Sequence, residues 1–289
     1  MAQNLSIYEQ LEFSTTRIEC YNDDGTVKYG TGFFYRVEND RLENNSFIPV
    51  VLTNKHVVEN MQHACICFSR SDSDGNPIFG EPYKFRFDLS SGLVFYHPND
   101  NVDLCAIAFQ PLISRLPDFA DKLFFRTFDK SLIPSEQQLK ELDSIEDVLM
   151  IGYPNALWDE KNNMPLVRKG ITASPVWLDF NGRKEFVIDA ACFPGSSGSP
   201  ILLCNIGSIR SKNGGLQLGA NRVYLLGVLY GGPQLTVEGD IRVKTVPDAQ
   251  QKPYSVSAIP NNLGYILKSE RIIELNDFIL SQLNLHGHK

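Results

Sequence analysis

The sequence lacks any apolar run that approaches the roughly 20 residues needed to cross a bilayer. It also lacks internal repeats and low-complexity segments. Basic residues are in the minority, with 27 Lys and Arg against 34 Asp and Glu, so the net charge is −7. This balance disfavours nucleic acid or an anionic membrane as a primary partner. The first residues contain neither the basic nor the apolar region of a signal peptide, and we therefore expect a cytoplasmic protein.

The chain has six cysteines, an even number that permits disulfides. Most of them lie inside apolar, strand-like runs, where a free cysteine packs as a small hydrophobic side chain. Because a secretion signal is lacking, we expect the thiols to be reduced. These residues are Cys20, Cys65, Cys67, Cys105, Cys192 and Cys204.

One group of residues has the spacing of a metal site. On a strand, the period of two places His63, Cys65 and Cys67 on one face. A fourth ligand with matching spacing is not evident, so a core-facing strand is the favoured interpretation, and we predict neither a metal nor a cofactor. A thiol- or metal-dependent enzyme centred on these three residues stays open as an alternative, and elemental analysis would test it.

Short runs of β-branched and aromatic residues, separated by turn-forming clusters, predict an almost entirely β protein. The first set of expected strands covers residues 15–21, 29–37, 47–53, 64–68, 84–87 and 104–109. The second set covers residues 147–151, 166–171, 186–190, 200–203, 223–230 and 265–267. In the connector between the two sets, residues 135–138 fit a capping box that opens a short helix. Residues 269–283 have the apolar spacing of a helix, with Ser269 as its N-cap.

The most informative segment is Pro194–Pro200, which reads Pro-Gly-Ser-Ser-Gly-Ser-Pro. A nucleophilic serine needs an exposed Oγ and nearby backbone N–H groups that can point at an oxyanion. Glycine permits that backbone geometry, so the segment favours Ser197 as a nucleophile. A serine at its free pKa is a poor nucleophile, however, and needs an adjacent base.

Two upstream residues fit the roles of base and orienting acid. His56 follows a β-rich run, and histidine can take a proton and return it near neutral pH. Asp103 stands at the start of another apolar run, where burial would let it orient the imidazole, whereas Asp100 has the context of a solvated loop. The chain order His, Asp, Ser is the chymotrypsin order. The other four histidines, His63, His97, His286 and His288, lack such a context.

Five segments, taken in order, resemble those of trypsin-like serine peptidases with the chymotrypsin fold. The chain is most similar to the bacterial HtrA/DegP-like branch, without a PDZ domain, and the resemblance covers about residues 14 to 270. The segments are Gly30–Phe34, Thr53–Val58, Val102–Leu104, Ile151–Pro154 and Gly195–Pro200.

The resemblance implies two six-stranded antiparallel β-barrels and a C-terminal helix, with the active site in the cleft between the barrels. It divides the chain into an N-terminal extension over residues 1–13 and a peptidase domain over residues 14–285. Within the domain we expect the first barrel over 14–110, the connector over 111–146, the second barrel over 147–268 and the helix over 269–283.

The resemblance also assigns roles to single residues. It implies His56, Asp103 and Ser197 as the catalytic triad, with the backbone N–H groups of Gly195 and Ser197 as the oxyanion hole.

Around the substrate pocket, the resemblance places Ala191 at the base, Cys192 in a wall, and Tyr230, Gly231 and Gly232 on the opposite wall. An uncharged base favours a small or medium apolar residue before the scissile bond over Arg or Lys. The position that is acidic in animal trypsins and pairs with a freed N-terminus is Ser196 here, so activation by N-terminal clipping is not expected.

We therefore predict a serine endopeptidase that acts on protein substrates. By analogy with the family, these would be a few specific intracellular partners in a bacterial stress or anti-phage (antiviral) defence system. The alternative is a catalytically inactive trypsin-fold module that binds a partner in its cleft. Labelling of Ser197 with a fluorophosphonate would separate the two.

Overall fold

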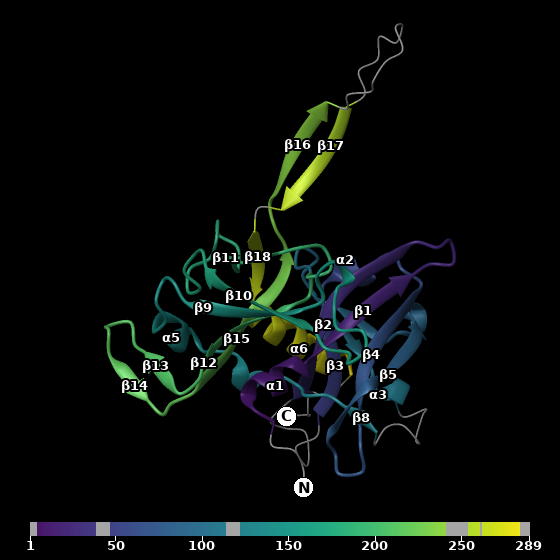
Figure 1. The fold of residues 1–289 in the computed structure, drawn as a ribbon, viewed down its shortest axis with the longest axis horizontal. Coiled ribbons are helices and arrows are strands. Elements are labelled where there is room, and N and C mark those ends of the chain that lie inside the picture. Colours follow the sequence, from purple (N-terminus) through teal and green to yellow (C-terminus); the bar gives the residue numbers. More distant parts are fainter. Residues whose placement is uncertain (1–4, 39–46, 114–121, 241–253, 261, 284–289) are drawn as a thin grey trace, which may run out of the picture.

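The computed structural model describes residues 5–38, 47–113, 122–240, 254–260 and 262–283. The N-terminal half is an eight-stranded antiparallel sheet in the order β5-β4-β1-β2-β3-β7-β6, with β8 paired to β4 (Figure 1). Its strands are β1 (Thr15–Tyr21), β2 (Val27–Glu38), β3 (Phe47–Thr53), β4 (His63–Ser71), β5 (Pro77–Asp88), β6 (Val94–Tyr96), β7 (Cys105–Ala108) and β8 (Leu123–Phe124).

The C-terminal half contains a closed six-stranded barrel in the order β10-β11-β18-β15-β12-β9, with antiparallel neighbours throughout. Two separate two-stranded ribbons extend from it, β13 with β14 and β16 with β17. The strands are β9 (Asp147–Gly152), β10 (Leu166–Thr172), β11 (Glu185–Asp189), β12 (Pro200–Asn205), β13 (Ser208–Arg210), β14 (Leu216–Leu218), β15 (Arg222–Gly231), β16 (Gln234–Asp240), β17 (Tyr254–Pro260) and β18 (Leu263–Lys268).

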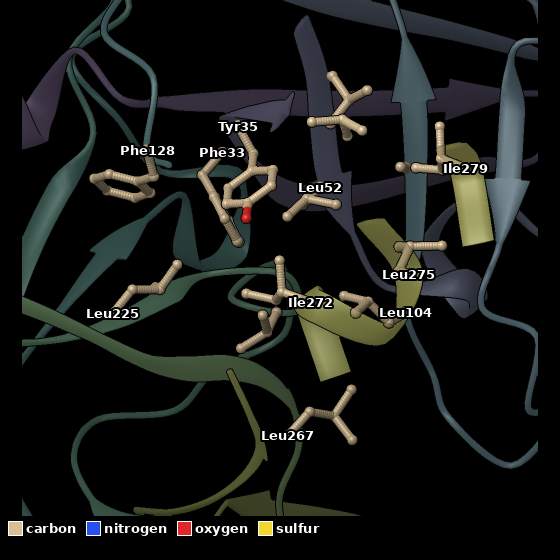
Figure 2. Close-up of a cluster of buried hydrophobic side chains, with 14 of the residues drawn as sticks. Phe33, Tyr35, Leu52, Leu104, Phe128, Leu225, Leu267, Ile272, Leu275 and Ile279 are labelled. Carbon is tan, nitrogen blue, oxygen red and sulfur yellow. The ribbon is translucent and has the colours of Figure 1, made fainter. Parts of the chain in front are cut away.

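The C-terminal helix α6 (Glu270–Gln282) joins the two halves through a shared core. Its apolar positions Ile272, Leu275 and Ile279 are fully buried. Figure 2 shows them among Leu52 of the first sheet and Leu267 of the barrel. Since burying one such side chain contributes about 2 kcal/mol, the packing of this helix against both halves stabilises their arrangement.

The other helices of the described residues are short. They are α1 (Ile7–Glu12), α2 (Lys55–Val58), α3 (Gln110–Ile113) and α5 (Glu136–Lys140), with 3-10 turns at Leu89–Ser91, Lys130–Leu132 and Pro154–Ala156. Ser135 and Gln138 form the expected capping box of α5. In the part of the chain that the structure describes, no helix has both the length and the apolar character needed to span a membrane.

The predicted fold class, a mostly β protein with the chymotrypsin-like pair of β units and a C-terminal helix, is confirmed. The N-terminal unit is larger than the six strands expected, and among its described residues β5 and β6 do not pair to close the path. The additional strands β6 and β8 are only three and two residues long, which is too short to produce a period-two pattern.

Candidate active site

His56 is carried to the surface by the turn that follows a buried strand. Strand β3 ends at Thr53, and Asn54 in extended conformation leads into the four-residue helix α2. Val57 and Val58 are buried and anchor this helix, while 48% of the His56 side chain is exposed. The local pattern of apolar and polar residues therefore presents the imidazole to solvent on a fixed support.

Asp103 holds this imidazole in one orientation. Its Oδ2 lies 2.5 Å from His56 Nδ1, and its Oδ1 accepts a hydrogen bond from the His56 backbone N–H at 3.0 Å. Asn54 Nδ2 in turn donates to the Asp103 carbonyl oxygen at 2.7 Å. With Nδ1–H donating to a carboxylate, Nε2 is left as the basic nitrogen of the neutral ring. Asp100 is fully exposed, and its carbonyl oxygen contacts Lys55 instead.

Ser197 lies where the two halves of the molecule meet. Its carbonyl oxygen accepts from the N–H of Thr31 on β2, at 2.8 Å. The next residue, Gly198, donates its N–H to Leu229 of β15 at 2.8 Å. Gly198 has φ +87°, and a Cβ there would collide with the Thr31 carbonyl oxygen, so the turn requires glycine at this position.

The backbone on either side of Gly195 is also held. Asn155 donates its N–H to the Pro194 carbonyl oxygen at 2.5 Å, and Thr31 Oγ1 donates to the Gly195 carbonyl oxygen at 2.9 Å. In a trans peptide the N–H points opposite to the preceding carbonyl, so the Gly195 N–H is turned away from Asn155. Within the described residues, no hydrogen bond uses the N–H of Gly195 or of Ser197. These two N–H groups are therefore not used by hydrogen bonds within the described structure.

A pocket of about 280 Å³ opens beside Ser197. Of the residues that the sequence analysis assigned to the substrate pocket, Cys192, Tyr230, Gly231 and Gly232 line it, together with Ser197 itself. Ala191 is not among the described residues that line it. Burial raises the pKa of the Cys192 thiol to about 11, so this side chain is a neutral wall at physiological pH.

Sequence reasoning missed a largely buried cation that bonds the loop carrying Ser197. Arg168 on β10 donates from one terminal nitrogen to the Ala191 carbonyl oxygen at 2.7 Å and to Ser196 Oγ at 2.8 Å. Its Nε and its second terminal nitrogen are buried without a hydrogen-bond partner among the described residues. Burial lowers the pKa of Arg168 to about 10, which still leaves it charged at neutral pH. The segment Leu166–Thr172 alternates exposed and half-buried residues, and nothing in that alternation distinguishes Arg168 from a solvated side chain.

The other candidate residues have separate surroundings. His63 contacts Asp88 (2.6 Å) and Asp23 (3.2 Å), and the hydrogen bond to Asp88 raises its pKa. His97 is buried against Glu274 of α6, and burial lowers its pKa. His286 and His288 lie outside the described residues.

Cys65 and Cys67 are buried, and all six cysteines are free thiols. Among the described residues, no three His, Cys, Asp or Glu side chains lie close enough together to hold a metal ion.

Residues 30–209 match the family model of the trypsin-like peptidase domain. The chain belongs to this family. No curated protein matches the sequence. Similar solved structures include an inactive mutant of Rv3671c from M. tuberculosis H37Rv (16% identity, 99% of this chain and 94% of that chain covered, TM-score 0.45). They also include the serine endoprotease from Yersinia pestis (14% identity, 99% of this chain and 70% of that chain covered, TM-score 0.43). A third is the HtrA-type protease AlgW with tripeptide (13% identity, 94% of this chain and 62% of that chain covered, TM-score 0.46).

Proposed function

We propose that this member of the trypsin-like peptidase family is a serine endopeptidase with Ser197 as nucleophile, His56 as base and Asp103 as orienting acid. The observation that carries the proposal is the His56–Asp103 pair, with Nδ1 and Oδ2 2.5 Å apart. Further support comes from Ser197, which lines a pocket and lies beside two N–H groups that make no hydrogen bond among the described residues.

In this mechanism Ser197 Oγ attacks the carbonyl carbon of the scissile peptide while its proton passes to His56 Nε2. The negative charge that develops on the carbonyl oxygen is stabilised by the N–H groups of Gly195 and Ser197. His56 then returns the proton to the leaving amine, which breaks the C–N bond and leaves an acyl-enzyme. Water, deprotonated by His56 in the same way, hydrolyses the ester and regenerates Ser197. Asp103 stabilises the imidazolium at each step and keeps its own charge.

Arg168 supports two details of the proposal. It forms a cationic support inside the loop that carries Ser197, because it bonds Ser196 and Ala191 at the same time. The loop therefore has an internal partner where animal trypsins use a freed N-terminus. The positive charge of Arg168 acts on Cys192 in the pocket wall, and it also opposes a positively charged Arg or Lys of the substrate before the scissile bond. The neutral walls and the volume of about 280 Å³ favour a small or medium apolar residue there.

We further propose a few partner proteins in the cytoplasm as substrates, as in the bacterial stress and anti-phage systems whose peptidases the sequence resembles. Support for this extension comes from the family analogy and from the small pocket, which suits selective cleavage.

The test of the proposed function is peptide cleavage by Ser197→Ala compared with His63→Ala. The first variant loses the nucleophile but keeps its backbone contacts, so it should fold and have no measurable turnover. The second alters a histidine that contacts Tyr21, Asp23 and Asp88, none of them a residue of the proposed triad, and it should retain wild-type kcat/KM. Undiminished cleavage by folded Ser197→Ala would show that another group is the nucleophile.

A further inference from the structure

The ribbon formed by β16 and β17 leaves the barrel directly at the candidate active site. It is antiparallel over its described length, from Gln234 opposite Pro260 to Asp240 opposite Tyr254. Figure 1 shows it projecting away from the body of the molecule. Among the described strands, none pairs with either side of it. A lone two-stranded ribbon is marginal in water, and its edges expose backbone groups that can pair with another chain.

The base of the ribbon forms part of the pocket beside Ser197. Only Gly232 and Pro233 separate β15 from β16, and both line that pocket, as does Leu263 at the start of β18. A Cβ on Gly232 would collide with the Leu263 carbonyl oxygen, so the two stems of the ribbon approach closely. The ribbon therefore starts from the pocket wall without an intervening loop.

One strand edge runs from the pocket along the ribbon. On the side of β15 opposite β18, pairing with β12 ends at Val228, and the last backbone bonds join Leu229 to Ser199 and Gly198. From Tyr230 onward, no described strand lies beside that edge. Strand β16 follows β15, and β17 leads back into β18, so the ribbon extends the pair formed by β15 and β18. Among the described strands, β16 pairs only with β17. Its other side therefore continues the edge that is open at Tyr230.

We propose that β16 extends the substrate-binding edge beyond the pocket, so that it binds residues of an extended polypeptide substrate well before the scissile bond. The substrate would add a strand antiparallel to Tyr230–Gly232 and then to β16. Such a strand runs along β16 first and reaches Ser197 afterwards, so residues before the scissile bond lie on the ribbon. If the residue before the scissile bond lies opposite Tyr230, Gln234 to Asp240 face about the fifth to the eleventh residue before that bond.

This inference rests on the proposed serine peptidase activity and specifies its substrate class. The enzyme would cleave peptides long enough to reach β16 more efficiently than shorter ones, since backbone pairing along the ribbon adds affinity without requiring a particular side chain.

The first experiment compares a peptide that reaches only Gly232 with a longer one that reaches Asp240, both with the same scissile bond. A variant with residues 234–260 replaced by a short Gly-Ser linker should cleave the short peptide like wild type. Its kcat/KM for the long peptide should fall about tenfold, to the value for the short one. The matched control shortens the ribbon of β13 and β14, which does not line the pocket, and should leave both values unchanged.

The second experiment uses the unaltered protein, so it does not depend on the folding of a deletion variant. Single N-methyl groups are placed at successive backbone nitrogens of the long peptide. Strand addition predicts that every second substitution lowers kcat/KM, because only alternate N–H groups point at β16.

Three outcomes would overturn the proposal while short peptides are still cleaved. The first is an equal kcat/KM of wild type for the long and the short peptide. The second is an N-methyl series in which kcat/KM does not alternate from one position to the next. The third is a deletion variant that differs from wild type only in its oligomeric state. The last would assign the ribbon to a second copy of the chain. If the wild-type protein cleaved none of the peptides, this would instead contradict the proposed function itself.

Discussion

Replacing Asp103 with Asn should change the tautomer of His56 while leaving its position intact. The His56 backbone N–H can only donate, so the Asn carbonyl oxygen must take the place of Oδ1, which accepts that bond at 3.0 Å. The Asn NH₂ group then faces His56 Nδ1, where Oδ2 was. Since NH₂ can only donate, Nδ1 must accept, and the ring proton moves to Nε2. A protonated Nε2 cannot take the proton of Ser197.

The expected loss is about 10⁴-fold in kcat at neutral pH, which corresponds to roughly 5.5 kcal/mol of transition-state stabilisation. The assay is steady-state cleavage of a fluorogenic peptide, with thermal unfolding to confirm that the fold is kept. Asp100→Asn is the matched control, because the Asp100 side chain is fully exposed and, among the described residues, contacts only Lys55. If folded Asp103→Asn cleaved within tenfold of wild type, the tautomer argument would be refuted.

Three further results are expected. Ala191→Asp should leave the kcat/KM ratio of Lys to Leu substrates unchanged, because Ala191 is not among the described residues that line the pocket and Arg168, already bonded to its carbonyl oxygen, would pair with the new carboxylate; a rise in this ratio would disprove the argument. Gly198→Ala should lower the free energy of unfolding by roughly 2 kcal/mol or more, because φ +87° and the nearby Thr31 carbonyl oxygen both oppose a Cβ; denaturant titration would measure this loss. Burial lowers the pKa of His97 in the folded protein, so the unfolded chain binds more protons at this residue, and the free energy of unfolding should fall as the pH drops below about 6.5. Urea titrations of His97→Gln should show a smaller fall, and a fall as large as that of wild type would contradict this.

The sequence predicted the strands that have a strong period. The bounds of β1 and β3 coincide with the expected 15–21 and 47–53, and the capping box at Ser135 forms as expected. These features depend on residues close together in the chain, which is why pattern reasoning finds them. The α1 helix was missed although Ser6 and Glu9 form a capping box of the same kind, because the six-residue helix is too short for a clear periodicity.

The parts of the site that depend on tertiary contacts could not be predicted. The sequence placed His56 and Asp103 in suitable contexts, but their 2.5 Å contact depends on how the loop before β7 lies against α2. Arg168 reaches Ala191 and Ser196 only because the barrel brings β10 under their loop. The ribbon of β16 and β17 was not expected as strands, since its pairing partners are separated by residues with no evident turn motif.

The most direct test of the account is reaction with a fluorophosphonate, followed by mapping of the adduct in the intact protein and its peptides. This reagent phosphonylates an activated serine, so it probes nucleophile, base and oxyanion site without requiring a known substrate. The account predicts one adduct per chain, on Ser197, whose rate falls strongly in His56→Ala and is unchanged in His63→Ala. A folded protein that forms no adduct, or forms it on another serine, would contradict the claim that Ser197 is the nucleophile of a peptidase.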